Sequence, residues 1–360
     1  MSLSVRLTHS FEDRRFDISF DAPGGVTVLF GGSGSGKTTI VNAVAGLLRP
    51  EEGRIAVEDR VLFDSDTGTN LKPHKRRLGY IFQEGRLFPH LSVKQNLLYG
   101  RWFAPKSAMP ARLDNVVEML GIGSLLTRRP NALSGGEKQR VAIGRALLAG
   151  PELILADEPL AALDEARKAE ILPYFERLRD EARVPILYVS HSAAEVARLA
   201  TSVVVLQDGK VARQGSASEV LSDPSVTPMG VRSVGAVLEA YVRCHHDDGL
   251  SELNAGDVPL FLPRVSKDIG DMVRVRVAAQ DVMLSRDRPV GLSALNIVPG
   301  TVASIRPGTG PGAIVSLDTA AGRILSRVTR RSVADLGLAP GVSCHAIIKT
   351  VSVSPKDVGG

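Results

Sequence analysis

The sequence contains few cysteines and few aromatic residues. Its two cysteines, Cys244 and Cys344, lie far apart and belong to no C-x-x-C pair. This usage excludes a disulfide framework and favours reduced thiols in an intracellular setting. One Trp and five Tyr leave little material for stacking nucleic-acid bases, and the basic residues are spread along the chain. We therefore expect no nucleic-acid partner.

Long hydrophobic runs are also missing. No stretch reaches the roughly 18 to 20 apolar residues that a membrane helix needs. Residues 1–6 carry no apolar signal segment, so we expect a protein that stays inside the cell and does not itself cross a bilayer. The remaining composition, 44% hydrophobic and 23% charged, is that of an ordinary globular protein. A length of 360 residues predicts two or three domains.

The most informative stretch is Gly31–Thr39, whose first eight residues match the pattern G-x-x-x-x-G-K-[ST]. It follows an apolar run at 26–30, which predicts a buried strand, and precedes a segment with helical spacing at 40–48. Strand, glycine loop and helix in this order are typical of a phosphate-binding loop. Backbone N–H groups and the helix N-terminus would surround a polyphosphate, with Lys37 at the terminal phosphates and the Thr38 hydroxyl on Mg²⁺. The alternative, a flexible Gly/Ser connector, gives no reason for Lys-Thr-Thr at a helix start.

The first 224 residues or so alternate apolar strands with helical segments, which predicts an α/β fold with a parallel sheet. Strands are expected at 3–7, 16–20, 26–30, 54–57, 60–63, 78–82, 153–156, 186–191 and 203–206. Helical patterns are expected at 84–130, 135–148 and 165–183, and a basic surface turn at 73–77. Short alternating strands further on, such as 271–277, 312–317 and 344–349, indicate a small all-β barrel or sandwich.

Four polar residues stand where predicted strands end. Asp157 is placed to hold Mg²⁺ together with Thr38, and Glu158 beside it is a candidate to orient or deprotonate the attacking water. His191 is a candidate contact to the γ-phosphate, and Gln83 a candidate ligand for metal or water. A single Gln or His at a strand end is as often a satisfied structural residue. The recurrence of such residues in one sheet favours a catalytic role for Glu158, His191 and Gln83.

A second glycine-containing helix start, LSGGEKQR at 133–140, is a further anion site in principle. This stretch resembles the signature sequence of ABC-transporter ATPases. Other motifs of that family follow in the expected order: Walker A at 31–38, the Q-loop at Gln83, Walker B at 153–158, the D-loop at 163–164 and the H-loop at His191. One departure is Ala161-Ala162 ahead of Leu163-Asp164, where the family often has Ser.

The resemblance implies an ATP site shared between two copies of the chain, with ATP and Mg²⁺ as cofactors and the signature of one copy completing the site of the other. It also implies that Phe11 stacks on adenine. The nucleotide-binding residues expected on this basis are Gly31, Gly32, Ser33, Gly34, Ser35, Gly36, Lys37, Thr38, Thr39, Phe11, Ser134, Gly135, Gly136 and Glu137.

The C-terminal region contains GLSALNIVPGTV at 291–302, which resembles the opening of the Mop fold, a small β-barrel that binds molybdate or tungstate. Leu295 stands where that family usually has Arg. A tetrahedral oxyanion suits Ser and Asn side chains with a nearby Lys, so Ser293, Asn296 and Lys349 are candidate oxyanion contacts. The alternative is that Ser293 and Asn296 only shape a turn before a strand.

The stretches 79–90 and 140–148 are similar to the ATPase subunits of molybdate importers. This similarity implies an energy-coupling ATPase that works as a dimer on two membrane permease subunits, peripheral to the cytoplasmic face of the inner membrane. A periplasmic or extracellular molybdate-binding protein would deliver the cargo, molybdate or tungstate, and the segment after Gln83 would dock on the permease. The implied domains are 1–230 for ATP binding, 231–288 as a β-rich connection and 289–355 as the Mop-type oxyanion-binding domain.

Three other functions remain open at this point. One is the ATPase of an importer for sulfate or another anion. Another is an ABC ATPase that acts on nucleic acid, with the C-terminal barrel as an oligonucleotide-binding module. The last is a regulatory molybdate sensor in which ATP hydrolysis is secondary.

Overall fold

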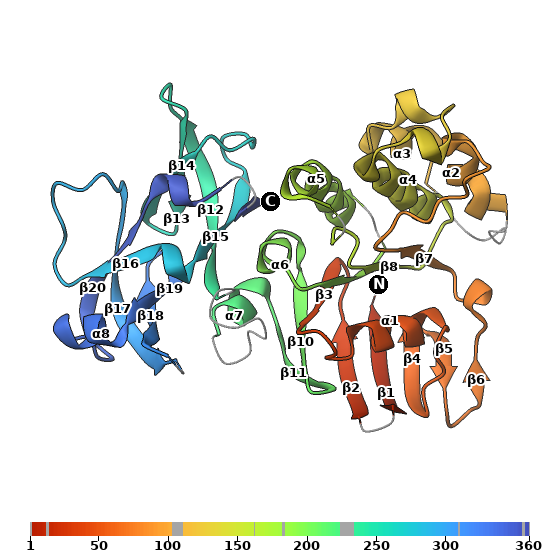
Figure 1. Cartoon of the computed structure of the whole chain (residues 1–360), viewed down its shortest axis with the longest axis horizontal. Coiled ribbons are helices and arrows are strands. Elements are labelled where there is room, and N and C mark those ends of the chain that lie inside the picture. The colour runs from red at the N-terminus through yellow and green to blue at the C-terminus, as the bar shows by residue number, and fades with distance from the viewer. Residues whose placement is uncertain are drawn as a thin grey trace. The chain divides into compact units, whose positions relative to one another are not determined.

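The computed structural model describes residues 2–11, 14–102, 111–161, 163–181, 184–223, 234–308, 310–354 and 357–359 (Figure 1). The chain forms two compact units, one of residues 1–191 and 199–215 and the other of residues 192–198 and 216–360. The domain boundary predicted at 230/231 and the domain end predicted at 355 lie outside the described residues. Among the helices of the described part, none is long and apolar enough to cross a bilayer.

The first unit is built on a mixed 11-stranded sheet. In their order across the sheet, the strands are β6 (Thr69–Asn70), β5 (Arg60–Asp64), β4 (Glu52–Val57), β1 (Leu3–Phe11), β2 (Arg14–Ala22), β11 (Lys210–Gly215), β10 (Ser202–Gln207), β3 (Val26–Gly31), β9 (Ile186–Ser190), β8 (Leu153–Asp157) and β7 (Leu78–Ile81). The strands from β10 to β7 run parallel. Their carboxyl ends therefore lie along one edge, which is where parallel α/β sheets bind ligands.

The helices between β3 and β10 along the chain connect strands of the sheet, and residues 193–198 of the last of them belong to the second unit. They are α1 (Lys37–Ala45), α2 (Val93–Trp102), α3 (Leu113–Met119), α4 (Gly135–Leu148), α5 (Glu165–Glu181) and α6 (Ala193–Leu199), with short 3₁₀ turns η1 (Pro73–Lys75), η2 (Gly123–Leu125) and η3 (Pro130–Ala132). Helix α1 packs against β3 and β8. Figure 1 shows α2, α3 and α4 grouped beyond β7 as a helical subdomain. The predicted ABC-type α/β fold is thus confirmed.

The helical pattern expected from residue 84 onward is wrong for its first part, because the chain has no helix between Gln83 and Ser92. The buried Asn96 amide replaces helical hydrogen bonds there: its Oδ1 accepts from Phe88 N at 2.8 Å, and its Nδ2 donates to Phe88 O at 3.1 Å and Leu91 O at 3.2 Å. A side chain that bonds a backbone in this way competes with helix formation. Helix α2 consequently begins only at Val93.

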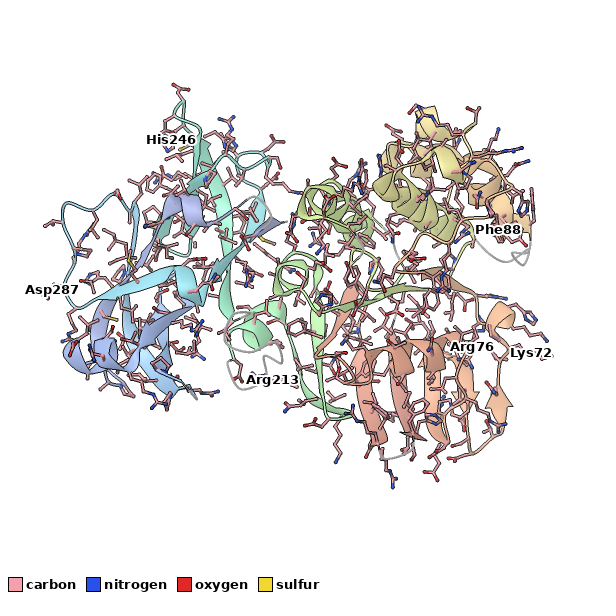
Figure 2. The ribbon with its side chains drawn as sticks, in the orientation of Figure 1. Lys72, Arg76, Phe88, Arg213, His246 and Asp287 are labelled. Atoms are coloured by element: carbon pink, nitrogen blue, oxygen red, sulfur yellow. The ribbon has the colours of Figure 1, made fainter. Side chains whose placement is uncertain are left out.

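Arg76 departs from the surface turn expected at 73–77, because its side chain is fully buried. Its guanidinium donates to the last carbonyls of α1, those of Ala43 at 2.6 Å and Val44 at 2.8 Å, and also to Leu71 O at 2.8 Å. The carbonyls at a helix C-terminus have no partner within the helix. Arg76 satisfies two of them, and burial lowers the pKa of its guanidinium. Figure 2 labels Arg76 in this part of the sheet unit.

The second unit contains two antiparallel five-stranded sheets. One is β14 (Val258–Pro263), β13 (Leu250–Ala255), β12 (Gly235–His245), β15 (Met272–Ala278) and β21 (Val358–Gly359), and the other is β16 (Val282–Ser285), β20 (Ser343–Ile348), β17 (Asn296–Pro307), β18 (Gly312–Thr319) and β19 (Gly322–Thr329). The short helices are α7 (Ala217–Leu221) and α8 (Arg330–Asp335), with 3₁₀ turns η4 (Ala279–Asp281) and η5 (Thr350–Ser352).

The two small sheets share one hydrophobic core. It includes Leu238 and Leu253 from the first sheet and Val298 and Leu317 from the second. Alternating burial along these strands, as in β15, places one face of each sheet inward, which is the pattern of packed antiparallel sheets. The predicted C-terminal all-β domain is confirmed.

Candidate nucleotide-binding site

The phosphate loop, residues 31–38, connects β3 to α1 as the sequence predicts. Gly36 caps α1 with φ of 108°, and a Cβ at that position would lie 2.8 Å from the Phe16 ring. Only glycine fits both the left-handed backbone and the close approach. Because Gly36 turns the chain directly into the helix, α1 starts at Lys37, three residues before the predicted Ile40.

Lys37 holds the loop in its curved shape. Its buried ammonium donates to Gly31 O at 2.9 Å and to Gly32 O at 2.8 Å. Burial lowers the pKa of Lys37, while the nearby carboxylates of Glu158 and Asp157 act in the opposite direction. The Ser35 hydroxyl is also buried and has no hydrogen-bond partner among the described residues. The remaining members expected to bind phosphate, Ser33, Gly34, Thr38 and Thr39, are exposed or half-buried on the same loop and helix start.

Asp157 is the last residue of β8. Its carboxylate interacts electrostatically with the ammonium group of Lys37 in the phosphate loop. The Tyr80 hydroxyl on the neighbouring strand β7 donates to Asp157 Oδ2 at 3.3 Å. Burial raises the pKa of the Asp157 carboxyl; the Tyr80 hydrogen bond and the Lys37 charge oppose that shift, and Glu158 adds to it. Burial raises the pKa of Tyr80, and the charge of Asp157 and the hydrogen bond to it add to that shift. This part of the site therefore holds its carboxylate at an electrostatic cost.

Glu158 and His191 lie together at the ends of the neighbouring strands β8 and β9. His191 Nδ1 is 3.4 Å from Glu158 Oε2. Glu158 has φ of 43° and donates its N–H to Val189 O at 3.2 Å. A non-glycine residue in the left-handed region is uncommon and is concentrated at functional sites. These two residues, both predicted at strand ends, thus lie together, and the Glu158 carboxylate faces the His191 imidazole.

Gln83 is exposed just beyond β7. Its neighbour Phe82 is fixed from two sides, since Gln139 Nε2 of α4 donates to Phe82 O at 3.3 Å and the Arg86 guanidinium lies 4.7 Å from the Phe82 ring centroid. Tyr80 was not among the predicted site residues, and Gln139 was predicted only as part of the signature stretch 133–140. The position of Tyr80 in the strand next to Asp157 was a usable signal, whereas the signature pattern does not indicate that the Gln139 side chain bonds Phe82 O.

Ser134 and Glu137 form a reciprocal cap at the start of α4. Ser134 Oγ accepts from Glu137 N at 3.2 Å, and Glu137 Oε2 accepts from Ser134 N at 2.7 Å. The Ser134 backbone N–H is the main cause that lowers the pKa of Glu137. Gly135 and Gly136 form the first turn of the helix. Within a single chain, the signature residues therefore cap and stabilise the N-terminus of α4.

Phe11 is the last residue of β1, and its ring is 44% exposed. It packs edge-on against Phe16, with ring centroids 5.9 Å apart, and against His9 at 4.5 Å. Since Phe16 in turn lies against Gly36, the exposed Phe11 ring is connected to the phosphate loop through one aromatic neighbour.

The three candidate oxyanion contacts differ in their surroundings. Ser293 and Lys349 are exposed. Asn296 is buried, and its amide bonds both sides of the Phe261 backbone, accepting from Phe261 N at 2.7 Å and donating to Phe261 O at 2.9 Å. The Asn296 side chain thus joins β17 to β14, which does not support a ligand role for it.

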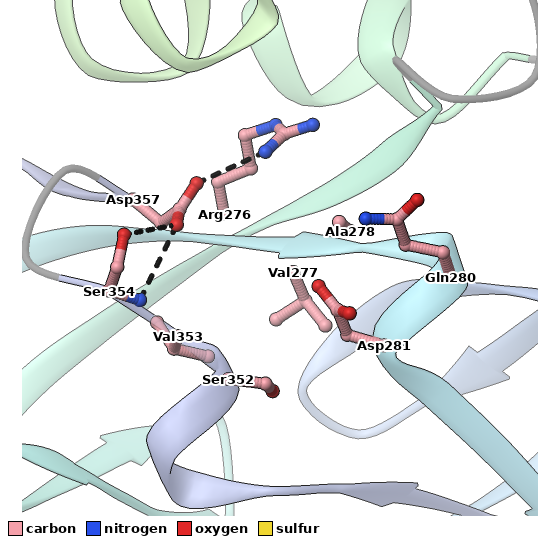
Figure 3. A pocket seen from close by; sticks show the side chains of 9 residues that line it. All are labelled: Arg276, Val277, Ala278, Gln280, Asp281, Ser352, Val353, Ser354 and Asp357. Atoms are coloured by element: carbon pink, nitrogen blue, oxygen red, sulfur yellow. Dashed lines mark hydrogen bonds and ion pairs between the residues drawn. The ribbon is translucent and has the colours of Figure 1, made fainter. Parts of the chain in front are cut away.

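A polar pocket of about 370 Å³ lies elsewhere in the β unit (Figure 3). Its basic member is Arg276, whose Nη1 is 3.0 Å from Asp357 Oδ1. A second carboxyl, Asp281, also lines it, and burial and the Asp357 charge raise the pKa of Asp281. Two carboxyl groups beside one guanidinium make this pocket a poor anion site.

Comparisons with known proteins agree with this geometry. The ABC transporter family profile matches residues 16–161, and the TOBE domain profile matches residues 292–355. The molybdenum import ATP-binding protein ModC of Mesorhizobium japonicum is 51% identical over 361 aligned positions, covering 100% of this chain and 98% of the relative. ModC of Rhizobium meliloti is 52% identical, with 98% of this chain and 99% of the relative covered.

Among solved structures, CbiO1 from Clostridium perfringens, part of the ABC transporter complex CbiONQ, matches with a TM-score of 0.52 and 29% identity. That match covers 61% of this chain and 90% of CbiO1. The motifs, the strand-loop-helix site and the full-length similarity agree. The chain belongs to the family of ABC transporter ATP-binding proteins, together with its relatives named molybdenum import ATP-binding protein ModC.

Proposed function

We propose that this chain is the ATP-hydrolysing, energy-coupling subunit of an ABC importer for molybdate. The observation that carries the proposal is the similarity to the ModC proteins over the whole chain, C-terminal domain included. A sulfate importer would share the ATP site but has no support from these relatives. The phosphate loop and the Glu158–His191 pair supply the chemistry that such a subunit needs.

In this proposal the phosphate loop binds the ATP phosphates. Its backbone N–H groups, the N-terminus of α1, the buried Ser35 hydroxyl and the Lys37 ammonium face the negative charge. The exposed Phe11 ring stacks on the adenine. Glu158 orients the attacking water or accepts its proton, and His191 holds the Glu158 carboxylate and contacts the γ-phosphate.

Oxygen donors suited to Mg²⁺ stand at the same edge of the sheet. The half-buried Asp157 carboxylate, the Thr38 hydroxyl and the Gln83 amide oxygen are the hard ligands that this ion prefers. These residues would hold the ion, which when bound neutralises charge on the phosphates. Tyr80 keeps the Asp157 carboxylate oriented through its hydrogen bond.

Ser134, Gly135, Gly136 and Glu137 act in this proposal on the nucleotide of a second copy. The protein is then a dimer that closes on two ATP molecules and pulls on two permease subunits, which dock on the segment after Gln83. It is peripheral to the cytoplasmic face of the inner membrane, and an external binding protein delivers molybdate or tungstate. In the β unit, the exposed Ser293 and Lys349 remain candidate oxyanion contacts.

Replacing Glu158 by Gln tests the composite site. The amide keeps the shape of the side chain but cannot accept the water's proton, so we expect turnover to fall by about a hundredfold or more. ATP should then hold the chain as a dimer in light scattering. Glu118→Gln, on the exposed side of α3, is the control and should behave as the wild type. A monomeric Glu158→Gln protein with normal turnover would contradict the proposal.

A further inference from the structure

Cys244, His246 and Glu252 meet at the tip of the β12–β13 hairpin, within the second unit and outside the ATP motifs. Figure 2 labels His246 at this tip. Cys244 lies directly across from Glu252 in the strand pairing. His246 is two residues beyond Cys244, so it returns to the same face of the hairpin, and its N–H closes the turn on Leu250 O at 2.8 Å.

A bulge in β12 contributes to this arrangement. The pairing register shifts between Val242 and Cys244, which leaves Arg243 as the extra residue. Such a bulge re-aims the side chains that follow it. The adjacent His245 faces elsewhere, since its ring contacts Ser251 Oγ at 2.8 Å and Lys267 O at 3.0 Å. The hairpin therefore separates two neighbouring histidines, and only His246 joins the cysteine and the carboxylate.

The three potential ligand atoms are close to equidistant. Cys244 Sγ is 3.5 Å from His246 Nε2 and 3.6 Å from Glu252 Oε2, and His246 Nε2 is 3.4 Å from Glu252 Oε2. In proteins, zinc lies about 2.3 Å from sulfur and about 2.0 to 2.1 Å from nitrogen or oxygen, with tetrahedral angles. Those bonds place sulfur about 3.6 Å from the other ligands, and nitrogen about 3.4 Å from oxygen. The three distances between the Cys244, His246 and Glu252 ligand atoms therefore match those expected between three ligands of one tetrahedral zinc ion.

The surroundings also suit a metal. Arg243 Nη1 donates to the other carboxylate oxygen, Glu252 Oε1, at 2.6 Å, which orients Oε2 toward the cysteine and the histidine. Outer partners of this kind commonly position metal ligands. The Glu252 side chain is 12% exposed and that of His246 40% exposed, so the site is anchored on one side and open on the other.

We propose that Cys244, His246 and Glu252 bind a zinc ion, with a water molecule at the open fourth position. Thiolate, imidazole and carboxylate together favour zinc over the hard ions magnesium and calcium. The site is distinct from the ATP site and clamps the β12–β13 hairpin. The competing interpretation is a hydrogen-bond network without metal, and the two interpretations differ in their response to added metal.

Cobalt titration of the nucleotide-free full-length protein tests the proposal. Cobalt replaces zinc in tetrahedral sites and absorbs through thiolate charge transfer and d–d transitions. We expect one cobalt ion per chain, a thiolate-to-cobalt band, and loss of that band when one equivalent of zinc is added. A wild-type protein that shows no such band, or keeps it after zinc is added, would overturn the proposal.

Variants identify the ligands. Cys244→Ser should remove the thiolate band and weaken zinc binding at least about tenfold, and Glu252→Gln should keep the band while weakening binding by a similar factor. Cys344→Ser is the matched control, because Cys344 is the other thiol and is buried in the core. An unchanged titration in Cys244→Ser, or loss of the band in Cys344→Ser, would show that Cys244 is not the ligand. Melting curves recorded without metal confirm that each variant is folded.

Discussion

At the residue scale, Asp157 shows a conflict between stability and function. Burial raises the pKa of its carboxyl above the ordinary 3.8, so the folded protein holds a proton there more tightly than the unfolded chain does. Stability therefore decreases as the pH rises through the interval from 3.8 to the raised pKa. At neutral pH the ionised carboxylate destabilises the nucleotide-free fold, yet the ionised form is the one that a metal requires.

Asp157→Asn should separate these effects. The amide oxygen can still accept the Tyr80 hydrogen bond, but no charge is buried. We expect a melting temperature at pH 7, without nucleotide, at or above that of the wild type, and a difference that shrinks as the pH is lowered toward 4. ATP turnover should fall by about a hundredfold or more. A variant that melts below the wild type at pH 7 would refute this account of the Asp157 environment.

Loss of the buried Arg76 side chain should lower stability without removing a residue of the ATP site. Arg76→Ala leaves the buried Val44 carbonyl without a donor and leaves Ala43 O with only the Gly46 N–H at 3.2 Å, and we expect the free energy of unfolding to drop by about 3 kcal/mol. Denaturant unfolding followed by the fluorescence of Trp102, the single tryptophan, measures this. Lys75→Ala, at an exposed neighbour, should change it by less than about 0.5 kcal/mol. Equal effects of both substitutions would mean that the Arg76 contacts contribute little.

At the element scale, two helices begin with the same reciprocal cap. Ser134 and Glu137 start α4, and Ser216 and Glu219 start α7 with matching geometry. The cap alone therefore does not distinguish a helix start from a nucleotide contact. The proposed function assigns a second role to Ser134 only, because its helix belongs to the signature motif.

Aspartate at these two positions tests that second role. Asp is as good an N-cap as Ser, so Ser134→Asp and Ser216→Asp should both melt within a few degrees of the wild type. Ser134→Asp places a negative charge against the partner's phosphates and should lower ATP turnover about a hundredfold. Ser216→Asp should leave turnover unchanged. Normal turnover in Ser134→Asp would show that Ser134 does not act on the nucleotide of the second copy.

The sequence predicted the elements whose pattern is local. The run before Gly31 and the glycines after it define strand, loop and helix, and the strand ends bring Glu158 and His191 together. Long-range contacts were not predictable. Arg76 lies in a basic sequence stretch typical of a surface turn, yet its side chain bonds the end of α1. Asn96 accepts a hydrogen bond from Phe88 N, which no local sequence pattern indicates. Asn296 likewise fits a turn pattern, while its amide bonds a strand 35 residues away.

At the scale of the whole molecule, the two units have different chemistry. The first carries the ATP site at one edge of its parallel sheet, and the second is an all-β unit with the Cys244 cluster and the exposed Ser293 and Lys349. Only the full-length similarity to ModC proteins links both units to one cargo. ATP hydrolysis in the first unit is therefore expected to drive the import of molybdate.

Molybdenum accumulation in cells tests this claim most directly. Cells that lack their own molybdate importer would make this chain together with its permease subunits and binding protein, at low external molybdate, and their molybdenum content would be measured. We predict uptake that persists in excess sulfate and is lost with Glu158→Gln. Uptake of sulfate instead of molybdate, or molybdate uptake that survives Glu158→Gln, would contradict the account.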